Sequence, residues 1–201
     1  MNVLFSYKGI QDRLFLDKYK FQIGPILAGQ KLRLLTSAFL HINYLHLAFN
    51  MYALFVFSDA VILGLGEFNF LLVYLGSLFV GNLFSLVYHK NEPYYSAVGA
   101  SGAVSGIVYS AVVLNPNMSL ILFPIPIPLP GYVFGVGYLL YSIYAMKKQL
   151  GNVGHSAHLG GAIGGFVITL LFCPNLLFQN TLIIVFLAIP MGLLYFIEKK
   201  K

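Results

Sequence analysis

The sequence predicts an all-α protein whose helices cross a membrane about six times, and three observations support this fold class. Of the 201 residues, 59% are hydrophobic and only 9% are charged, whereas a soluble domain is about 25% charged. Several apolar stretches approach the roughly 20 residues that one helix needs to cross a bilayer. Proline, glycine and asparagine separate these stretches. We therefore expect lipid to be part of the solvent of this chain.

The composition also excludes several classes of protein. An ordinary cytosolic enzyme or a disordered chain would carry more charge. A secreted disulfide scaffold is excluded because Cys173 is the single cysteine and cannot form an internal disulfide. The net charge of +6 would indicate a nucleic-acid partner only if the basic residues clustered on a folded surface. Here they flank apolar runs, so we expect a lipid bilayer as a partner and no nucleic acid.

Three segments follow one another along the chain. Residues 1–34 mix basic, acidic and apolar side chains, so we expect an interfacial or exposed N-terminal segment there. A membrane core is expected over residues 35–175, and an extra transmembrane helix with a basic tail over residues 176–201. The candidate spans are residues 35–63, 68–89, 97–114, 131–146, 156–172 and 177–197. Prolines alternate with apolar residues between Pro124 and Pro130, so we expect residues 123–130 to be extended and close to the membrane surface.

Polar side chains inside a span are costly, and they are therefore candidates for function. The first pair is His46 and Asn50, which lie four residues apart and share one face of a helix. Together they offer an imidazole and a carboxamide that can donate hydrogen bonds to one place. A hydrogen-bonded pair that only joins neighbouring helices would show the same spacing. These two residues alone leave both interpretations open.

A second group of candidates opens the third span. Ser101 lies between Gly99 and Gly102, and Gly106 follows Gly102 at the spacing of a close helix contact. Packing alone explains these small residues, and it is the more frequent reason for them. The chemical alternative is a serine whose hydroxyl is exposed at a helix N-terminus, where unpaired backbone N–H groups can stabilise an oxyanion.

The fifth span begins with a histidine followed by glycines. Gly161 and Gly165 predict a close helix contact, and His158 lies one turn before it. If the partner is the helix of Ser101, imidazole and hydroxyl meet. A serine needs such an adjacent base to act as a nucleophile near neutral pH.

The histidines also allow a rival interpretation. Some could bind a metal ion or serve as axial haem ligands in a membrane bundle. The residues available for this are His41, His46, His155 and His158. Such a site would account for neither the glycine-rich serine segment nor the carboxamide of Asn50.

The chain is similar to the rhomboid family of intramembrane serine proteases. Three motifs carry the resemblance in the family's order: His46-xxx-Asn50, Gly99-Ala-Ser101-Gly102 and His158-xx-Gly161-xxx-Gly165. His41 and Arg33 also agree with the family pattern, and the likeness runs from Gly29 to Pro174. Three features depart from it, and one of them is the extra candidate span over residues 177–197 after the core. Residues 1–34 do not supply the first helix usual before the loop with Arg33, and Leu32 stands where a tryptophan is common.

The resemblance implies a rhomboid-like core that cleaves transmembrane segments of other membrane proteins through a Ser–His dyad. Ser101 would be the nucleophile and His158 the general base, while His46 and Asn50 would form the oxyanion hole with the backbone N–H of Ser101. No cofactor and no metal are implied. The alternative is a non-catalytic rhomboid-like membrane chaperone that binds transmembrane helices, although such proteins usually lose one of these residues. We expect a multi-pass protein of a cell membrane, plasma or inner.

The basic residues raise a question of orientation. If connections alternate between faces, all 12 Lys and Arg residues fall on one face, and the positive-inside tendency makes that face cytoplasmic. The candidate site opens to the same face. The resemblance implies instead a site that opens to the outside, so the two indications conflict.

Overall fold

The computed structural model describes residues 1–122, 125–148 and 154–198. Within these residues the protein is a bundle of apolar helices, which confirms the predicted all-α membrane fold. The long helices are α5 (Tyr44–Leu65), α6 (Glu67–Tyr88), α7 (Ser101–Leu114), α8 (Gly131–Lys148), α9 (His155–Phe172) and α11 (Thr181–Glu198). By length and composition α5, α6 and α9 could each cross a membrane, and α7 is a shorter apolar helix.

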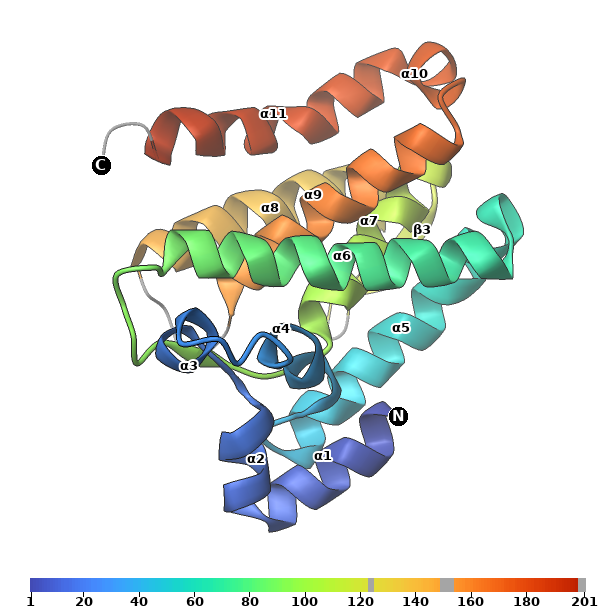
Figure 1. The fold of residues 1–201 in the computed structure, drawn as a ribbon. Helices are drawn as coiled ribbons and strands as arrows, with labels where there is room; N and C mark the ends of the chain where they lie inside the picture. The colour runs from blue at the N-terminus through green and yellow to red at the C-terminus, as the bar shows by residue number, and fades with distance from the viewer. Residues whose placement is uncertain (123–124, 149–153, 199–201) are drawn as a thin grey trace.

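The N-terminal part of the chain packs against one end of the bundle as a series of short helices (Figure 1). These are α1 (Asn2–Gln11), α2 (Arg13–Tyr19), α3 (Ile23–Leu27), α4 (Arg33–Thr36) and the 3₁₀ helix η1 (Ser37–Phe39). Asp12 separates the first two, because its carboxylate accepts the backbone N–H of Phe15 at 3.0 Å and so caps α2.

The first predicted span, residues 35–63, is wrong at its beginning. Residues 33–39 form the short helices α4 and η1 instead, and the long helix α5 begins only at Tyr44. Asn43 is the N-cap that sets this boundary, since its side chain accepts the backbone N–H of His46 at 2.8 Å.

Burial within the N-terminal part explains why those apolar residues do not extend the span. A separate buried cluster is formed by Phe21, Ile23, Ile26 and Leu34. The Arg33 guanidinium donates to the backbone carbonyls of Asp17 and Lys20 at 2.8 and 2.9 Å, which fastens α4 to the C-terminal end of α2. The short strand β1 (Phe21–Gln22) then pairs antiparallel with β2 (Ser96–Ala97) in the connection between α6 and α7. The N-terminal part therefore braces the loop that leads into α7.

Helix α7 is the centre of the bundle. Its residues from Gly102 to Val113 are all buried, and the helix contacts α5, α6, α8 and α9. The predicted span 97–114 starts earlier than α7 does, because Ala97 belongs to β2. A helix that is apolar and enclosed on every side contributes to packing and can present only its ends to water.

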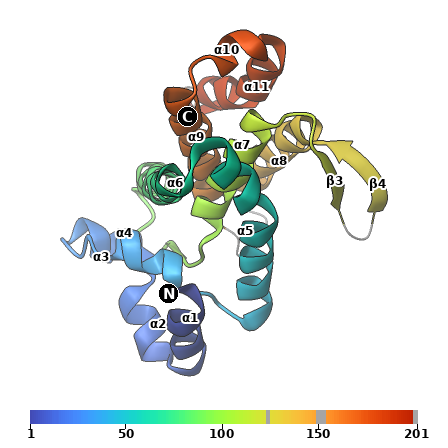
Figure 2. The same ribbon diagram turned by 90° about the vertical axis from the view of Figure 1, so that its right-hand side faces the viewer.

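A hairpin projects from the bundle beside α8 (Figure 2). Its strands are β3 (Ser119–Leu122) and β4 (Ile125–Pro130), which pair antiparallel with Ser119 opposite Pro130. The extended conformation predicted from the alternating prolines is confirmed for Ile125–Pro130, and residues 123–124 lie outside the described residues. After α9, the short helix α10 (Leu176–Gln179) leads into α11, which packs on α8.

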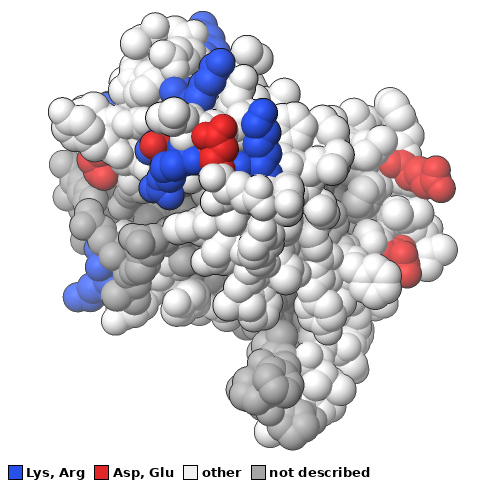
Figure 3. Space-filling model, turned by 90° about the horizontal axis from the view of Figure 1, so that it is seen from below, with Lys and Arg blue, Asp and Glu red and all other residues white. Residues whose placement is uncertain are grey.

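The helix ends that surround the candidate site lie together at one end of the bundle. The last residues of α6 and α8 and the first residues of α7 and α9 lie at this end, next to the N-terminal part (Figure 1). Lys90 follows α6, and Lys147 and Lys148 end α8. Seen from below, Lys and Arg gather toward one side of the visible face, and the charged groups visible on the opposite side are acidic (Figure 3).

Candidate functional site

Helices α7 and α9 touch through their backbones. A Cβ atom on Gly161 would overlap the backbone carbonyl of Gly102, and a Cβ on Gly165 would overlap that of Gly106. A Cβ on Gly102 would lie 3.2 Å from the carbonyl oxygen of Ala157. The predicted close contact thus joins the two glycine-rich helices to each other. It places their first turns side by side.

This contact brings together the elements of the two residues predicted to react. Ser101 is the first residue of α7, next to Gly102, and His158 lies in the first turn of α9, next to Ala157. Nε2 of His158 is buried and has no hydrogen-bond partner among the described residues. An imidazole nitrogen without a partner is available to exchange a proton.

His46 approaches Ser101 from the other side. Gly99 has φ = +134°, and a Cβ at this position would lie 2.8 Å from Cε1 of His46 and 3.5 Å from Oγ of Ser101. The residue must therefore be glycine, both for its backbone conformation and for space. His46 and Ser101 line one cavity of about 380 Å³, whose walls also include the apolar side chains of Leu45 and Phe49.

Asn50 lies one turn after His46 on α5, as the spacing predicted. Its side chain is buried, with 6% of its surface exposed, and its Nδ2 donates to the backbone carbonyl of His46 at 2.9 Å. This bond uses one of the two amide protons. Neither Asn50 nor His158 is among the residues that line the cavity of Ser101.

Tyr138 on α8 lies beside the His158 ring, a contact that the sequence analysis did not predict. The two rings are nearly parallel, with centroids 6.3 Å apart and an angle of 19° between their planes. The Tyr138 hydroxyl lies 2.6 Å from Oγ of Ser105, which donates to the backbone carbonyl of Ser101 at 2.7 Å. Tyr138 therefore links the histidine to the helix of the serine. A tyrosine in an apolar span resembles ordinary core packing, so its role had no sequence signal.

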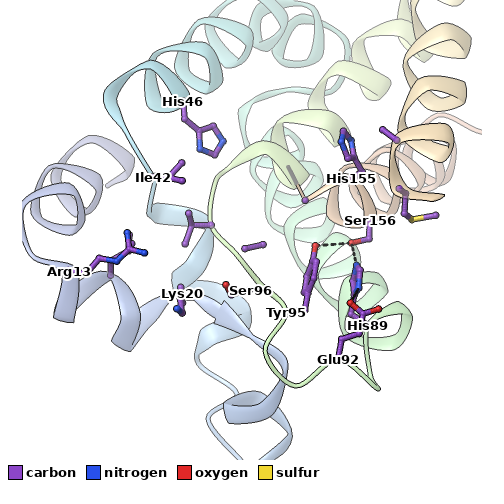
Figure 4. Close-up of a pocket in the computed structure, with 16 residues that line it drawn as sticks. Arg13, Lys20, Ile42, His46, His89, Glu92, Tyr95, Ser96, His155 and Ser156 are labelled. Atoms are coloured by element: carbon purple, nitrogen blue, oxygen red, sulfur yellow. Dashed lines mark hydrogen bonds and ion pairs between the residues drawn. The ribbon is translucent and has the colours of Figure 1, made fainter. Parts of the chain in front are cut away.

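A second polar cluster, also not predicted, joins α6 to the start of α9 (Figure 4). His89 lies with Nδ1 3.1 Å from Oε2 of Glu92 and Nε2 3.2 Å from Oγ of Ser156. The Tyr95 ring stacks on His89 with centroids 3.5 Å apart, and its hydroxyl lies 3.3 Å from Oγ of Ser156. Burial raises the pKa of Tyr95, so its hydroxyl stays protonated. Since Ser156 is two residues before His158, the cluster fixes the beginning of α9.

These side chains border a cavity of about 410 Å³. Arg13 and Lys20 line it on the side away from His89 (Figure 4), and Nζ of Lys20 lies 2.8 Å from Oδ1 of Asp17. That hydrogen bond holds the pKa of Asp17 below its usual value. His46 lines this cavity as well as the one that contains Ser101. Among the described residues, no group of three His, Cys, Asp or Glu side chains could hold a metal ion.

Comparisons with known proteins agree on one family. A family model described as the Rhomboid domain matches residues 28–175. Rhomboid protein 1, mitochondrial, of Saccharomyces cerevisiae is 32% identical over 154 residues, which are 75% of this chain and 44% of that protein. The Bacillus subtilis protein named "Putative rhomboid protease YdcA" is 35% identical over 148 residues, 71% of this chain and 68% of that protein.

A human protein extends this comparison. Presenilin-associated rhomboid-like protein, mitochondrial, of Homo sapiens is 34% identical over 138 residues, which are 66% of this chain and 35% of that protein. The chain thus spans less than half the length of the yeast and human relatives.

Proposed function

This chain belongs to the rhomboid family, and we propose that it is an intramembrane serine endopeptidase that cleaves transmembrane segments of other membrane proteins. One observation carries the proposal: the backbone contact of Gly102 with Gly161, which sets the first turns of α7 and α9 side by side. Ser101 and His158 stand on these two turns. We therefore propose Ser101 as the nucleophile and His158 as the general base.

The reaction follows from these positions. His158 takes the proton of the Ser101 hydroxyl as the oxygen attacks the substrate carbonyl, and returns it to the leaving amine. Among the described residues, the histidine that bonds a carboxylate is His89, with Glu92, and not His158. We therefore assign catalysis to a dyad, with Tyr138 in place of a carboxylate as the neighbour of the imidazole.

We assign the oxyanion hole to His46, Asn50 and the backbone N–H of Ser101. Ser101 begins α7, so its N–H has no partner within the helix, and Ala100 supplies no side-chain cap. The helix dipole adds partial positive charge at the same place. The His46 ring lies close enough to Gly99 and Ser101 to reach an oxygen bound there.

The substrates and the membrane are also proposals. A helix protects its peptide bonds inside its own hydrogen bonds, so we expect substrates whose spans contain small or helix-breaking residues. The apolar helices identify a membrane protein. The sequence-based expectation of a plasma or inner membrane has no support from the yeast and human relatives, which are both named as mitochondrial.

Cleavage of a model transmembrane substrate in liposomes tests the proposed function. We expect the purified wild-type chain to cut it, and Ser101→Ala to leave it intact. Asn50→Ala should lower kcat/KM by about 10²–10³, the usual effect of removing one oxyanion donor. Ser58→Ala is the matched control, because this serine only bonds the carbonyl of Phe55 in its own helix. A wild-type chain that binds the substrate helix without cutting it would instead support the chaperone alternative.

Tyr138 gives a further prediction about the dyad. Tyr138→Phe keeps the ring over His158 but loses the hydrogen bond to Ser105, so we expect kcat to fall by less than about 10-fold. Tyr138→Ala also removes the ring, and His158 can then rotate, so we expect a loss of about 10²-fold or more because proton transfer depends on position. Steady-state kinetics of both variants shows whether Tyr138→Ala loses more activity than Tyr138→Phe. Equal losses would show that the ring does not orient the histidine.

A further inference from the structure

His41 is a buried histidine that the proposed reaction does not use. It lies between η1 and α5, and its exposed fraction is 0%. Nδ1 lies 2.7 Å from Oγ of Ser6 on α1, and Nε2 accepts the backbone N–H of Ala100 at 3.3 Å. Ala100 is the N-cap residue of α7. The imidazole thus holds the peptide unit directly before the proposed nucleophile, Ser101.

The direction of each hydrogen bond follows from its donors. A backbone N–H can only donate, so Nε2 of His41 must be the acceptor and carry no proton. In the neutral ring the proton is then on Nδ1, which donates to Oγ of Ser6. Ser6 in turn donates to the backbone carbonyl of Phe39 at 3.0 Å. Each proton in this series of hydrogen bonds has one acceptor. Only the Nδ1–H tautomer of His41 allows this arrangement.

Other contacts make the same segment rigid. The backbone N–H of Gly99 donates to the carbonyl of Ser37 at 3.1 Å. The ring of His41 also packs edge-on against the ring of His46, with centroids 4.9 Å apart and an angle of 74°. One imidazole therefore touches both the segment before Ser101 and the histidine assigned to the oxyanion hole.

We propose that His41, as the neutral Nδ1–H tautomer, is a positioning residue that ties α1 to the backbone of Ala100 and so fixes the orientation of Ser101. Its effect on catalysis rests on the proposed protease function, whereas its tautomer does not. A proton on Nε2 would face the N–H of Ala100, and two buried donors would then have no acceptor between them.

The surroundings favour the neutral ring. Burial lowers the pKa of His41 to about 4, with a smaller contribution from the charge of His46. Ser6 on α1 and the peptide of Ala100 are uncharged, so His46 is the titratable group that faces it. Because the pKa is lowered on folding, the unfolded chain binds this proton first as the pH falls. The stabilising effect is complete above about pH 6.5 and is lost between there and about pH 4.

Two substitutions of similar size separate positioning from mere space-filling. In His41→Gln the amide oxygen is as many bonds from the backbone as Nε2, so it can still accept the N–H of Ala100. In His41→Asn the amide reaches only as far as Nδ1. We expect His41→Asn and His41→Ala to lower kcat by about 10- to 100-fold with little change in KM, since a buried donor loses its acceptor. His41→Gln should recover kcat to within about 3-fold of wild type.

Nitrogen NMR of wild-type protein labelled at histidine provides a readout without activity. We expect the His41 signals to show a proton on Nδ1 and a bare Nε2, unchanged from about pH 8 to about pH 5. A proton on Nε2, or titration near the ordinary pKa, would overturn the proposal whether or not any variant folds. So would a fully active His41→Ala chain, or His41→Gln that is as slow as His41→Asn. If wild type cleaves nothing but shows this tautomer, the protease proposal fails and the structural role of His41 stands.

Discussion

A chain that lacks both Ser101 and His158 is expected to cleave no more slowly than a chain that lacks either one. Each single substitution to alanine should lower kcat by at least about 10⁴, because nucleophile and base act as one unit. Without His158 the Ser101 hydroxyl keeps its proton, and without Ser101 the imidazole has nothing to activate. Single-turnover cleavage of a model transmembrane substrate by the two single variants and the double variant measures this. The increases in activation free energy of the two single variants should not add up in the double variant.

Two results would contradict this account of the dyad. If the losses of the two single variants multiply in the double variant, Ser101 and His158 act independently and do not share a proton. If His158→Ala keeps substantial activity, another base serves Ser101, and His155 is then the neighbouring imidazole to replace, since its ring lies 5.9 Å from that of His158. A fluorophosphonate that labels wild type but not Ser101→Ala confirms that the loss is at the nucleophile.

Replacing Gly161 should have the largest effect on stability. A Cβ at this position would fall on the backbone carbonyl of Gly102, and a backbone in the buried helix α7 cannot move aside as a flexible side chain can. We expect Gly161→Ala to destabilise the fold by about 3 kcal/mol or more, above the usual cost of overpacking. Separation of α7 from α9 would also remove His158 from Ser101, so activity should be lost even in the protein that remains folded.

Gly137 provides the matched control for this prediction. It is an exposed glycine on α8, with no atom within 4 Å of the position where a Cβ would be. Gly137→Ala should therefore leave stability unchanged or raise it by up to about 1 kcal/mol, the helix preference of alanine over glycine. Reversible unfolding in detergent, followed by helix content, compares the two variants. Equal stability of Gly161→Ala and Gly137→Ala would show that the backbone contact contributes nothing.

The sequence was sufficient to predict the features that repeat along a helix. Apolar stretches located the long helices. The four-residue spacings of Gly102 with Gly106 and of Gly161 with Gly165 indicated close contacts, whose partners the structure identifies. The beginning of α5 was not predictable in this way. An apolar residue such as Leu34 can face lipid or a local cluster, and only the position of Phe21 and Arg33 decides which.

The site shows the same limit. The spacing of His46 and Asn50 follows from helix geometry and needed no tertiary information. Tyr138 and His41 could not be assigned roles, because their partners come from distant segments. Ser105 lies 33 residues from Tyr138, and Ala100 lies 59 residues from His41. Two-residue strands such as β1 and β2 are also too short to leave a periodic pattern.

The length of α7 indicates how far below the membrane surface Ser101 lies. Its 14 residues measure about 21 Å at about 1.5 Å per residue, whereas the hydrocarbon core of a bilayer is about 30 Å thick. With the far end of α7 at the opposite interface, Ser101 stands roughly 9 Å below the nearer surface. An extended chain covers that distance in about three residues. If the proposed protease function holds, a substrate helix must unwind by about one turn inside the lipid. The position of its weak point along the membrane normal would then be part of what the protein recognises.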